Sequence, residues 1–471
     1  MKGAAAEPVA VSIGRCGFEA MNGGASADLS VGERVLAEVL RVARVQPPAQ
    51  LADVIMEHAQ PLGVRRAVVY LADLQETVLV PLPSHADIVA DISDEVDVRD
   101  PGAIVADRGV VRIEGTVAGL AYRKLTVVTA EDSDTPGEVT LVDEPVRQHR
   151  VWLPLLDGTA RLGVLELVLE HLDEQVLQRC HLLAGMVGLL VASYGVHSDA
   201  FDQVRRREPM HLSAEMVWAF MPGQTYATED VVISAAAEPV YRLGGDAYDF
   251  SSMDHTVHLS LFDAAGHDLV AGLVAAVGLA SCRSTRRAGG GLTDIALLAD
   301  TAIREHSPEW RFMTGLLINL HTGTGRLEWV NCGHPPPLLI RRNRVVKELP
   351  GLPDPPMGLL EGARPRVRCE TLQPGDRLLC YTDGVTEART PEGEQFGVDR
   401  LADTIIRTTA AGMSAPEALR RLIHGLFSEQ RGGALSDDAT VLLTEWRPTI
   451  PTGSVHNSFQ TLPNSTSNHA E

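Results

Sequence analysis

The sequence YRLGGDAYDFSSMDHTVHLSLFDAAGHD (Tyr241–Asp268) organises the part of the chain that surrounds it. An alternating segment of strand length, Val257–Phe262, lies between two short loops rich in glycine, alanine and aspartate. Asp246 belongs to the first loop and Asp263 to the second. Carboxylates at strand ends beside small residues suit Mg²⁺ or Mn²⁺, which retain bound waters. Asp and Gly also favour ordinary turns, so these two aspartates alone leave a turn and a metal site as alternatives.

Two later segments also place an aspartate at one end of a strand. Asp376–Tyr381 is strand-like and is followed by Thr382-Asp383-Gly384, and Asp437 lies just before the strand-like Thr440–Glu445. Carboxylates that converge within a few ångströms repel one another by several kcal/mol unless opposite charge is present. Two divalent cations would neutralise them and would supply an activated water and a clamp for phosphoryl oxygens. The recurrence therefore favours a metal site over isolated turns.

Five blocks of sequence carry a family resemblance: GGDAYDF, LFDAAGHDLVAGL, NCGHPPPLLI, LLCYTDGVTEA and LSDDATVLL. In order and spacing they resemble the metal-dependent protein phosphatases (PPM), and in particular the bacterial SpoIIE/RsbU branch. The resemblance covers residues 225–447. It implies an α+β fold, an α-β-β-α sandwich in which two antiparallel sheets carry a dimetal site at one edge.

The resemblance also implies roles for individual residues. Asp263 matches the carboxylate that bridges two cations, Mn²⁺ or Mg²⁺, and the Ala264 carbonyl would contact one of them. Asp383 and Asp437 match ligands of the second cation, and Asp246 matches the residue that supports the first. Asp263 and Asp383 are the residues on which we expect hydrolysis to depend.

The chain departs from the family pattern at two positions near this site. Phe262 occupies a position where the family frequently has glycine. Asp268 occupies the position after Gly266-His267, where the family often has another glycine. Neither change removes a ligand, but Asp268 adds charge that would alter metal affinity or substrate choice. We expect His267 to cap or pack at a helix start, and His334 to shape a loop rather than act as an acid.

Asp438 and Thr440 are expected to have structural roles in the turn that follows Asp437.

The sequence predicts further helices and strands around these blocks. They are the helices Leu269–Cys282 and Leu292–His306, the strands Phe312–His321, Arg326–Asn331 and Pro337–Arg341, and a helix opened by Ser414. Arg283, Arg286 and Arg287 end the first helix, where positive charge offsets the helix dipole. We interpret these arginines first as a solvated end and second as a docking patch for a phosphoprotein.

The N-terminal part of the chain has a different order of elements. The sequence predicts helices at Val31–Val45, Pro48–Gln60 and Glu174–Tyr194, strands at Val64–Ala72 and Thr77–Val80, and a hairpin formed by Val151–Leu156 and Arg161–Leu169. Over residues 28–197 this order resembles a GAF-type sensory domain, which implies a small ligand. A small α+β domain without a ligand is the alternative.

Residues 198–224 connect the two parts as a linker helix. Leu212, Met216 and Phe220 recur on one stripe that ends before Pro222-Gly223. This stripe suits packing against a second copy, as a homodimer, or docking on the chain's own domain. We expect residues 1–27 to be a flexible leader and residues 448–471 a disordered tail.

Composition limits the classes of partner. The chain has 471 residues, with 62 acidic and 41 basic side chains and a net charge of −21, which argues against binding nucleic acid or anionic membranes. The six cysteines show no C-x-x-C pair, and no signal peptide is evident. The apolar runs Leu182–Ala192 and Leu269–Ser281 fall short of a membrane span and predict buried helices, so we expect a cytoplasmic protein.

These observations together predict a serine/threonine phosphoprotein phosphatase under the control of the N-terminal domain. By resemblance, its substrate is a phosphorylated STAS-type anti-sigma-factor antagonist. One alternative is a catalytically weak signalling module that acts by binding its partner. Another two-metal hydrolase, such as a phosphodiesterase, is the second alternative, but such sites usually include histidine ligands and none is placed here.

Overall fold

The computed structural model describes residues 31–43, 46–83, 109–131, 148–306, 311–359, 362, 364–390, 393–429 and 437–448. The predicted leader lies outside the described residues, as does all but the first residue of the predicted tail.

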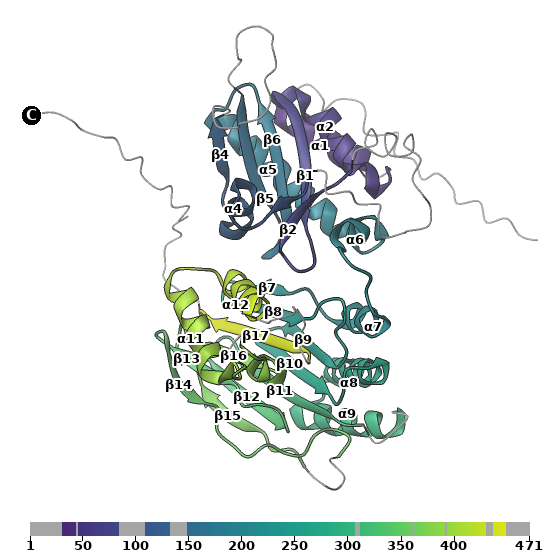
Figure 1. Ribbon diagram of the computed structural model, residues 1–471, viewed down its shortest axis with the longest axis vertical. Helices are drawn as coiled ribbons and strands as arrows, with labels where there is room; N and C mark the ends of the chain where they lie inside the picture. Colours follow the sequence, from purple (N-terminus) through teal and green to yellow (C-terminus); the bar gives the residue numbers. More distant parts are fainter. Residues whose placement is uncertain are drawn as a thin grey trace, which may run out of the picture. The chain divides into compact units, whose positions relative to one another are not determined.

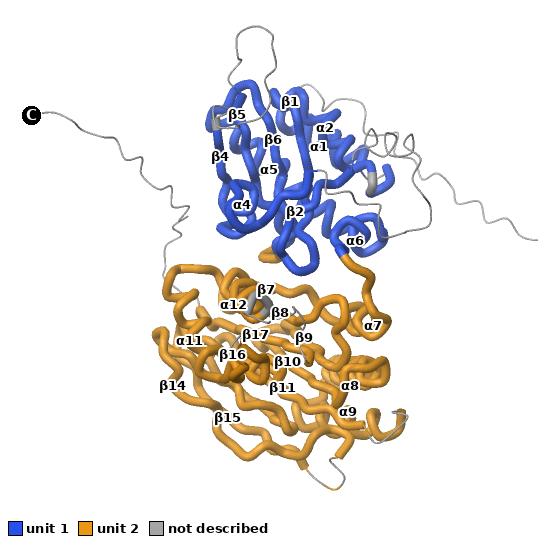
Figure 2. Tube along the Cα trace, in the orientation of Figure 1, with its two compact units in different colours: residues 1–157, 161–207 blue, residues 158–160, 208–471 orange. Residues whose placement is uncertain are grey.

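The chain divides into two compact units, which are coloured separately in Figure 2. Unit 1 comprises residues 1–157 and 161–207, and unit 2 comprises residues 158–160 and 208–471. The division falls inside the segment predicted as a linker. Helix α6 (Asp199–Arg205) belongs to unit 1 and helix α7 (Leu212–Phe220) to unit 2, so this segment forms two short helices rather than one.

Unit 1 contains one six-stranded antiparallel sheet of order β3-β2-β1-β6-β5-β4. Its strands are β1 (Val64–Ala72), β2 (Val78–Pro81), β3 (Val111–Arg112), β4 (Val128–Glu131), β5 (His149–Asp157) and β6 (Ala160–Leu169). Its helices are α1 (Val31–Ala43), α2 (Leu51–Ala59), α4 (Val117–Lys124), α5 (Glu174–Gly195) and α6, with short 3₁₀ turns at Pro48–Gln50 and Gln60–Leu62.

Two apolar clusters hold unit 1 together, one on each face of the sheet. Helices α1, α2 and α5 pack on one face, and α4 packs on the other, where Tyr122 is buried. The predicted hairpin is present, and Gly158 takes the positive φ that its turn requires. The unit is therefore an α+β domain, and the GAF-type assignment stays a prediction.

Unit 2 contains two antiparallel sheets. The first has the order β15-β12-β11-β10-β9 and the second β14-β13-β16-β17-β8-β7. The strands are β7 (Thr225–Ala227), β8 (Val231–Glu238), β9 (Asp246–Met253), β10 (Thr256–Ala264), β11 (Met313–His321), β12 (Arg326–Cys332), β13 (Leu338–Arg341), β14 (Arg344–Glu348), β15 (Arg368–Thr371), β16 (Arg377–Tyr381) and β17 (Ala439–Trp446).

Helices cover the outer face of each sheet. They are α7, α8 (Leu269–Arg287), α9 (Leu292–His306), α10 (Asp383–Glu387), α11 (Gly397–Ala410) and α12 (Ala415–Glu429). Helices α8 and α9 pack on the first sheet and α10 to α12 on the second, as the ribbon in Figure 1 shows. The result is an α-β-β-α sandwich, so the predicted α+β fold class is confirmed.

The sequence of helix α8 explains how closely it can approach the first sheet. Its small buried residues, such as Ala271 and Ala275, let the helix backbone come near the strands. At Gly278 a Cβ atom would lie 2.3 Å from the methyl group of Met313 on β11. The small-residue pattern therefore fixes the helix against the strands that carry Asp246 and Asp263.

Two features of the secondary structure differ from expectation. Strands β14 and β15 and helix α11 were not predicted, and β14 and β15 each have a largely exposed sequence with weak alternation. In α7 the buried residues are Ser213, Ala214 and Val217, whereas Leu212 on the predicted stripe is exposed. Helix α7 packs on α8, which is the docked alternative for this segment.

The arginines at the end of α8 also differ from expectation. Arg283 and Arg286 are not a solvated end, because both form ion pairs with the buried Asp249 on β9.

In the described part of the chain, two helices are long and apolar enough to cross a membrane by length and composition alone. They are α5 and α8, and both contribute buried residues to the cores of their units. We therefore interpret them as core helices.

Candidate metal centre

Asp246 and Asp263 face each other across two neighbouring strands. Asp246 is the first residue of β9, Asp263 is the second-last residue of β10, and their Cα atoms are register partners. Opposed residues of an antiparallel pair project to the same face of a sheet. His258 and Ser260, on the other face of β10, contact Cys282 of α8. The two carboxylates therefore project toward the second sheet.

The second sheet brings Asp383 and Asp437 to the same edge. Strand β16 ends at Tyr381, and Asp383 opens the short helix α10 rather than a simple loop. Asp437 precedes β17, which pairs with β16. Thr382 links the two sheets, because its hydroxyl donates a hydrogen bond of 2.7 Å to the Asp246 carboxylate.

Asp438 holds the glycine loop that precedes Asp246. One oxygen of its buried carboxylate accepts hydrogen bonds from the backbone N–H groups of Gly244 (2.8 Å), Gly245 (2.6 Å) and Asp246 (3.3 Å). A Cβ atom on Gly245 would lie 2.5 Å from the Ala264 carbonyl oxygen, so only glycine allows this approach. Asp438 thus has the structural role predicted for it.

The backbone N–H of Thr440 donates to the Thr382 hydroxyl (2.9 Å) rather than to the turn at Asp437.

Burial and mutual repulsion raise the pKa values of Asp246, Asp263 and Asp383. Burial, followed by the charges of Asp383, Asp437 and Asp438, raises the pKa of Asp263 to about 7. Burial, Asp263 and Asp438 hold the pKa of Asp246 well above its usual range. Burial also raises the pKa of Asp383, with smaller contributions from Glu387 and Asp437. In the ionised state these carboxylates therefore repel one another, and a proton or a cation would relieve that repulsion.

The chemistry of this cluster fits divalent cations. Its donors are carboxylate oxygens, which Mg²⁺ and Mn²⁺ prefer, and the structure gives Asp263 no ion pair with a described residue. Among the described residues, no three His, Cys, Asp or Glu side chains are arranged to hold a metal ion as they stand. Like charges repel, and a cation is what would draw these side chains together. The predicted ligand set, including the Ala264 carbonyl, stays a prediction.

The added negative charge of Asp268 is paired within the protein. Asp268 is the N-cap of α8: its carboxylate accepts the Ala271 N–H at 2.9 Å and pairs with Arg311 at 2.9 Å. These partners, the Ala271 N–H first, lower the pKa of Asp268. Arg311 also donates to the Ala265 carbonyl at 2.8 Å. The N-cap of α8 is therefore Asp268. His267, for which we predicted a role in capping or packing, is exposed.

The structure adds two residues that we did not place near the cluster. Thr314 on β11 is the register partner of Asp263, and its hydroxyl lies 2.9 Å from Nδ1 of His334. Burial lowers the pKa of His334 to about 3, so the imidazole is neutral at physiological pH. The motif NCGH was the only sequence signal for this histidine. Its pairing with Thr314 depends on tertiary structure.

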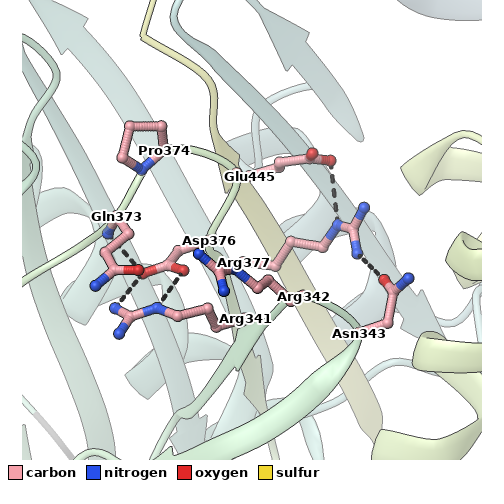
Figure 3. A pocket seen from close by; sticks show the side chains of 9 residues that line it. Arg341, Arg342, Asn343, Gln373, Pro374, Asp376, Arg377 and Glu445 are labelled. Carbon is pink, nitrogen blue, oxygen red and sulfur yellow. Dashed lines mark hydrogen bonds and ion pairs between the residues drawn. The ribbon is translucent and has the colours of Figure 1, made fainter.

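A cavity of about 460 Å³ lies at the opposite end of β16 from Asp383. Figure 3 shows that two of its arginines are paired with acidic side chains: Arg341 donates to Asp376 (2.8 and 2.6 Å), and Arg377 donates to Glu445 (3.2 Å). It holds no member of the carboxylate cluster. We therefore place the functional site at the carboxylate edge of the sandwich.

Known proteins resemble part of this chain. Residues 253–447 match the family model described as Stage II sporulation protein E (SpoIIE). Protein IcfG of Synechocystis sp. is 28% identical over 151 residues, which are 32% of this chain and 23% of that protein. The chain thus spans about a quarter of the length of this curated relative.

Solved structures give similarities at low identity. The RsbU and RsbW domains of Rv1364c from Mycobacterium tuberculosis are 24% identical, with a TM-score of 0.40, and the match covers 46% of this chain and 62% of that one. The SiaA-PP2C domain of Pseudomonas aeruginosa is 20% identical, with a TM-score of 0.42, over 54% of this chain and 99% of that one.

The family model contains Asp263, Asp383 and Asp437, and it begins after Asp246. Over residues 253–447 the chain is thus similar to the SpoIIE family.

Proposed function

We propose that unit 2 is a metal-dependent protein serine/threonine phosphatase. The observation that supports this proposal most strongly is the raised pKa of Asp246, Asp263 and Asp383 at one edge of the sandwich, where the charge of Asp437 adds to the repulsion. A carboxylate cluster of this kind suits two divalent cations, Mn²⁺ or Mg²⁺, which when bound supply an activated water and neutralise charge on a phosphoryl group.

The chain's own residues position this centre. Asp263 would bridge the two cations, Asp246 and the Ala264 carbonyl would support the first, and Asp383 and Asp437 would hold the second. Thr382 fixes the orientation of Asp246, and Asp438 fixes the loop before it. These contacts reduce the reorganisation that binding requires.

We propose that the substrate is phosphoserine or phosphothreonine on a regulatory protein. A STAS-type anti-sigma-factor antagonist is the proposed partner, on the basis of the similarity of residues 253–447 to the SpoIIE family. Unit 1 would act as a GAF-like sensory domain that binds a small ligand and regulates hydrolysis. A cytoplasmic location and a homodimer through α7, whose Leu212 is exposed, belong to the same proposal.

A phosphopeptide assay tests the proposal. The full chain should release phosphate from phosphoserine and phosphothreonine peptides when Mn²⁺ is present and not in EDTA. Asp383→Asn should reduce the rate by more than the roughly 100-fold that follows loss of an outer-sphere partner, because it removes a proposed ligand. Asp399→Asn, which removes an exposed carboxylate in the first turn of α11, is a control and should retain activity.

The binding-module alternative predicts a different result. Calorimetry would then show Mn²⁺ binding by the full chain, while no phosphopeptide would be hydrolysed. Unchanged hydrolysis in Asp383→Asn would contradict the assignment of the site.

A further inference from the structure

His334 is a buried side chain that the proposed hydrolysis leaves without a role. It is 3% exposed and lies in the loop between β12 and β13. The Asn331 side chain holds the backbone of this residue on both sides: its Nδ2 donates to the His334 carbonyl oxygen, and the His334 N–H donates to its Oδ1, both at 2.8 Å. Because Asn331 already closes the loop, the imidazole is not needed to shape it.

The imidazole reaches both sheets of the sandwich. Nδ1 lies 2.9 Å from the hydroxyl of Thr314, the register partner of Asp263 on β11. The backbone of Tyr381 also lies near the ring, and Tyr381 is the last residue of β16, two positions before Asp383. The ring therefore lies between the strand beside Asp263 and the strand that leads to Asp383.

The second ring nitrogen of His334, Nε2, can form a further hydrogen bond. Nε2 is buried and makes no hydrogen bond of acceptable geometry with any residue in the described part of the chain. Buried polar atoms without a partner are rare in native proteins, and each one indicates strain, a functional role or a bound water. The backbone of Tyr381 lies near the ring and is the candidate partner for Nε2.

We propose that His334 is a positioning residue, which joins β11 to β16 through Thr314 and Tyr381 and thereby sets the spacing between Asp263 and Asp383. This inference rests on the proposed phosphatase function. A rigid imidazole with a nitrogen on each side suits this task, whereas an apolar ring would fill the space without fixing the distance between the strands. Partners that orient metal ligands in this way control metal affinity strongly.

His258 provides a matched control on the other face of the same sheet. It is also 3% exposed, and its Nδ1 lies 2.9 Å from the side-chain oxygen of Asn319. Its Nε2 lies 3.5 Å from the Cys282 sulfur. Position 258 projects away from the carboxylate cluster, because it differs from position 263 by an odd number of residues along β10. A purely structural role for buried histidines would make the two positions equivalent.

The experiment measures Mn²⁺ affinity by calorimetry and the thermal midpoint in EDTA, both on the full chain. His334→Phe should weaken Mn²⁺ binding about 10- to 100-fold, and His334→Gln, whose amide can bond in both directions, should restore most of it. Thr314→Val removes only one hydrogen bond and should weaken binding in the same direction. His258→Gln should lower the thermal midpoint and leave the Mn²⁺ affinity unchanged.

Two results would overturn this inference while the wild-type chain binds Mn²⁺ and hydrolyses phosphopeptides. One is wild-type Mn²⁺ affinity in both His334→Phe and Thr314→Val. The other is an equal loss of affinity in His258→Gln. If His334→Phe does not fold, Thr314→Val and His334→Gln decide. Absence of Mn²⁺ binding in the wild-type chain would instead refute the proposed function, and the inference with it.

Discussion

A buried aspartate lies on each face of the first sheet of unit 2, and the two aspartates have opposite surroundings. On the outer face, the buried Asp249 is held by Arg283 (2.7 Å) and Arg286 (2.9 Å) of α8. On the inner face of the same strand, Asp246 is equally buried, and its described partners are hydroxyl groups and further carboxylates. A buried charge requires compensation. The protein supplies it for Asp249, and for Asp246 it must come from a proton or an added cation.

Removing the charge at Asp263 should give the largest effect on function. Asp263→Asn removes the proposed bridge, so Mn²⁺ binding and phosphopeptide hydrolysis should both fall by more than about 100-fold. The free energy of unfolding in EDTA should stay the same or rise, because a repelled carboxylate has been removed. Calorimetry and urea unfolding measure the two quantities. A loss of stability in EDTA would contradict the contrast between the two faces.

Removing the charge at Asp249 should give the opposite pattern. Asp249→Ala leaves Arg283 and Arg286 without their buried partner, and it should lower the free energy of unfolding by roughly 3 kcal/mol. This loss is near the lower end of the range for breaking a buried ion pair. Both arginines are partly exposed, so water compensates part of the lost interaction. Urea unfolding in EDTA measures this loss. Mn²⁺ affinity of the folded fraction should be unchanged, and a large decrease would show that the outer face also sets the metal centre.

The pH dependence of stability should also distinguish the inner face. Folding raises the pKa of Asp263 from 3.8 to about 7, so the folded state binds this proton more tightly than the unfolded state. Protonated Asp263 therefore contributes its full share to the free energy of unfolding below pH 4, and this contribution is lost as the pH rises from 4 to 7.

Urea unfolding in EDTA at several pH values tests this expectation. The difference in stability between the wild type and Asp263→Asn should move against the wild type as the pH rises through this window, by up to a few kcal/mol. Mn²⁺ should weaken the dependence, since the bound ion displaces the proton. A pH-independent difference would mean that Asp263 is not repelled by its neighbours.

The smallest effect should follow from Asp268→Ala. Asp268 caps α8 and pairs with Arg311, so its loss should lower the thermal midpoint by a few degrees. Mn²⁺ affinity should change little, because the charge of Asp268 is paired. Asp268→Asn retains a good cap and separates the cap from the ion pair. A large change in Mn²⁺ affinity in both variants would restore the initial hypothesis that Asp268 tunes the centre.

Much of the fold follows from local patterns. Strand β1 and helix α9 have the predicted bounds, because both have a clear period and distinct ends. Strands β14 and β15 were missed because edge strands with exposed residues lack that period. The face of α7 was assigned wrongly, because the small residues Ser213 and Ala214 pack on α8 while Leu212 remains exposed.

The sequence by itself determined the acidic residues at the strand ends and their resemblance to a known family. Strand periodicity, turn residues and block order are local properties, and they were sufficient to nominate Asp246, Asp263, Asp383 and Asp437. Periodicity also places Asp246 and Asp249 on opposite faces of their strand, but it does not indicate which of them is neutralised.

Only the tertiary structure decided how these charges are compensated. Asp249 meets arginines 34 and 37 positions away, Asp438 binds a loop 194 positions away, and His334 reaches the residue opposite Asp263. Such partners are chosen by strand register and by the packing of α8 on the sheet. The carboxylates left without cationic partners become visible as a site only once these long-range pairs are known.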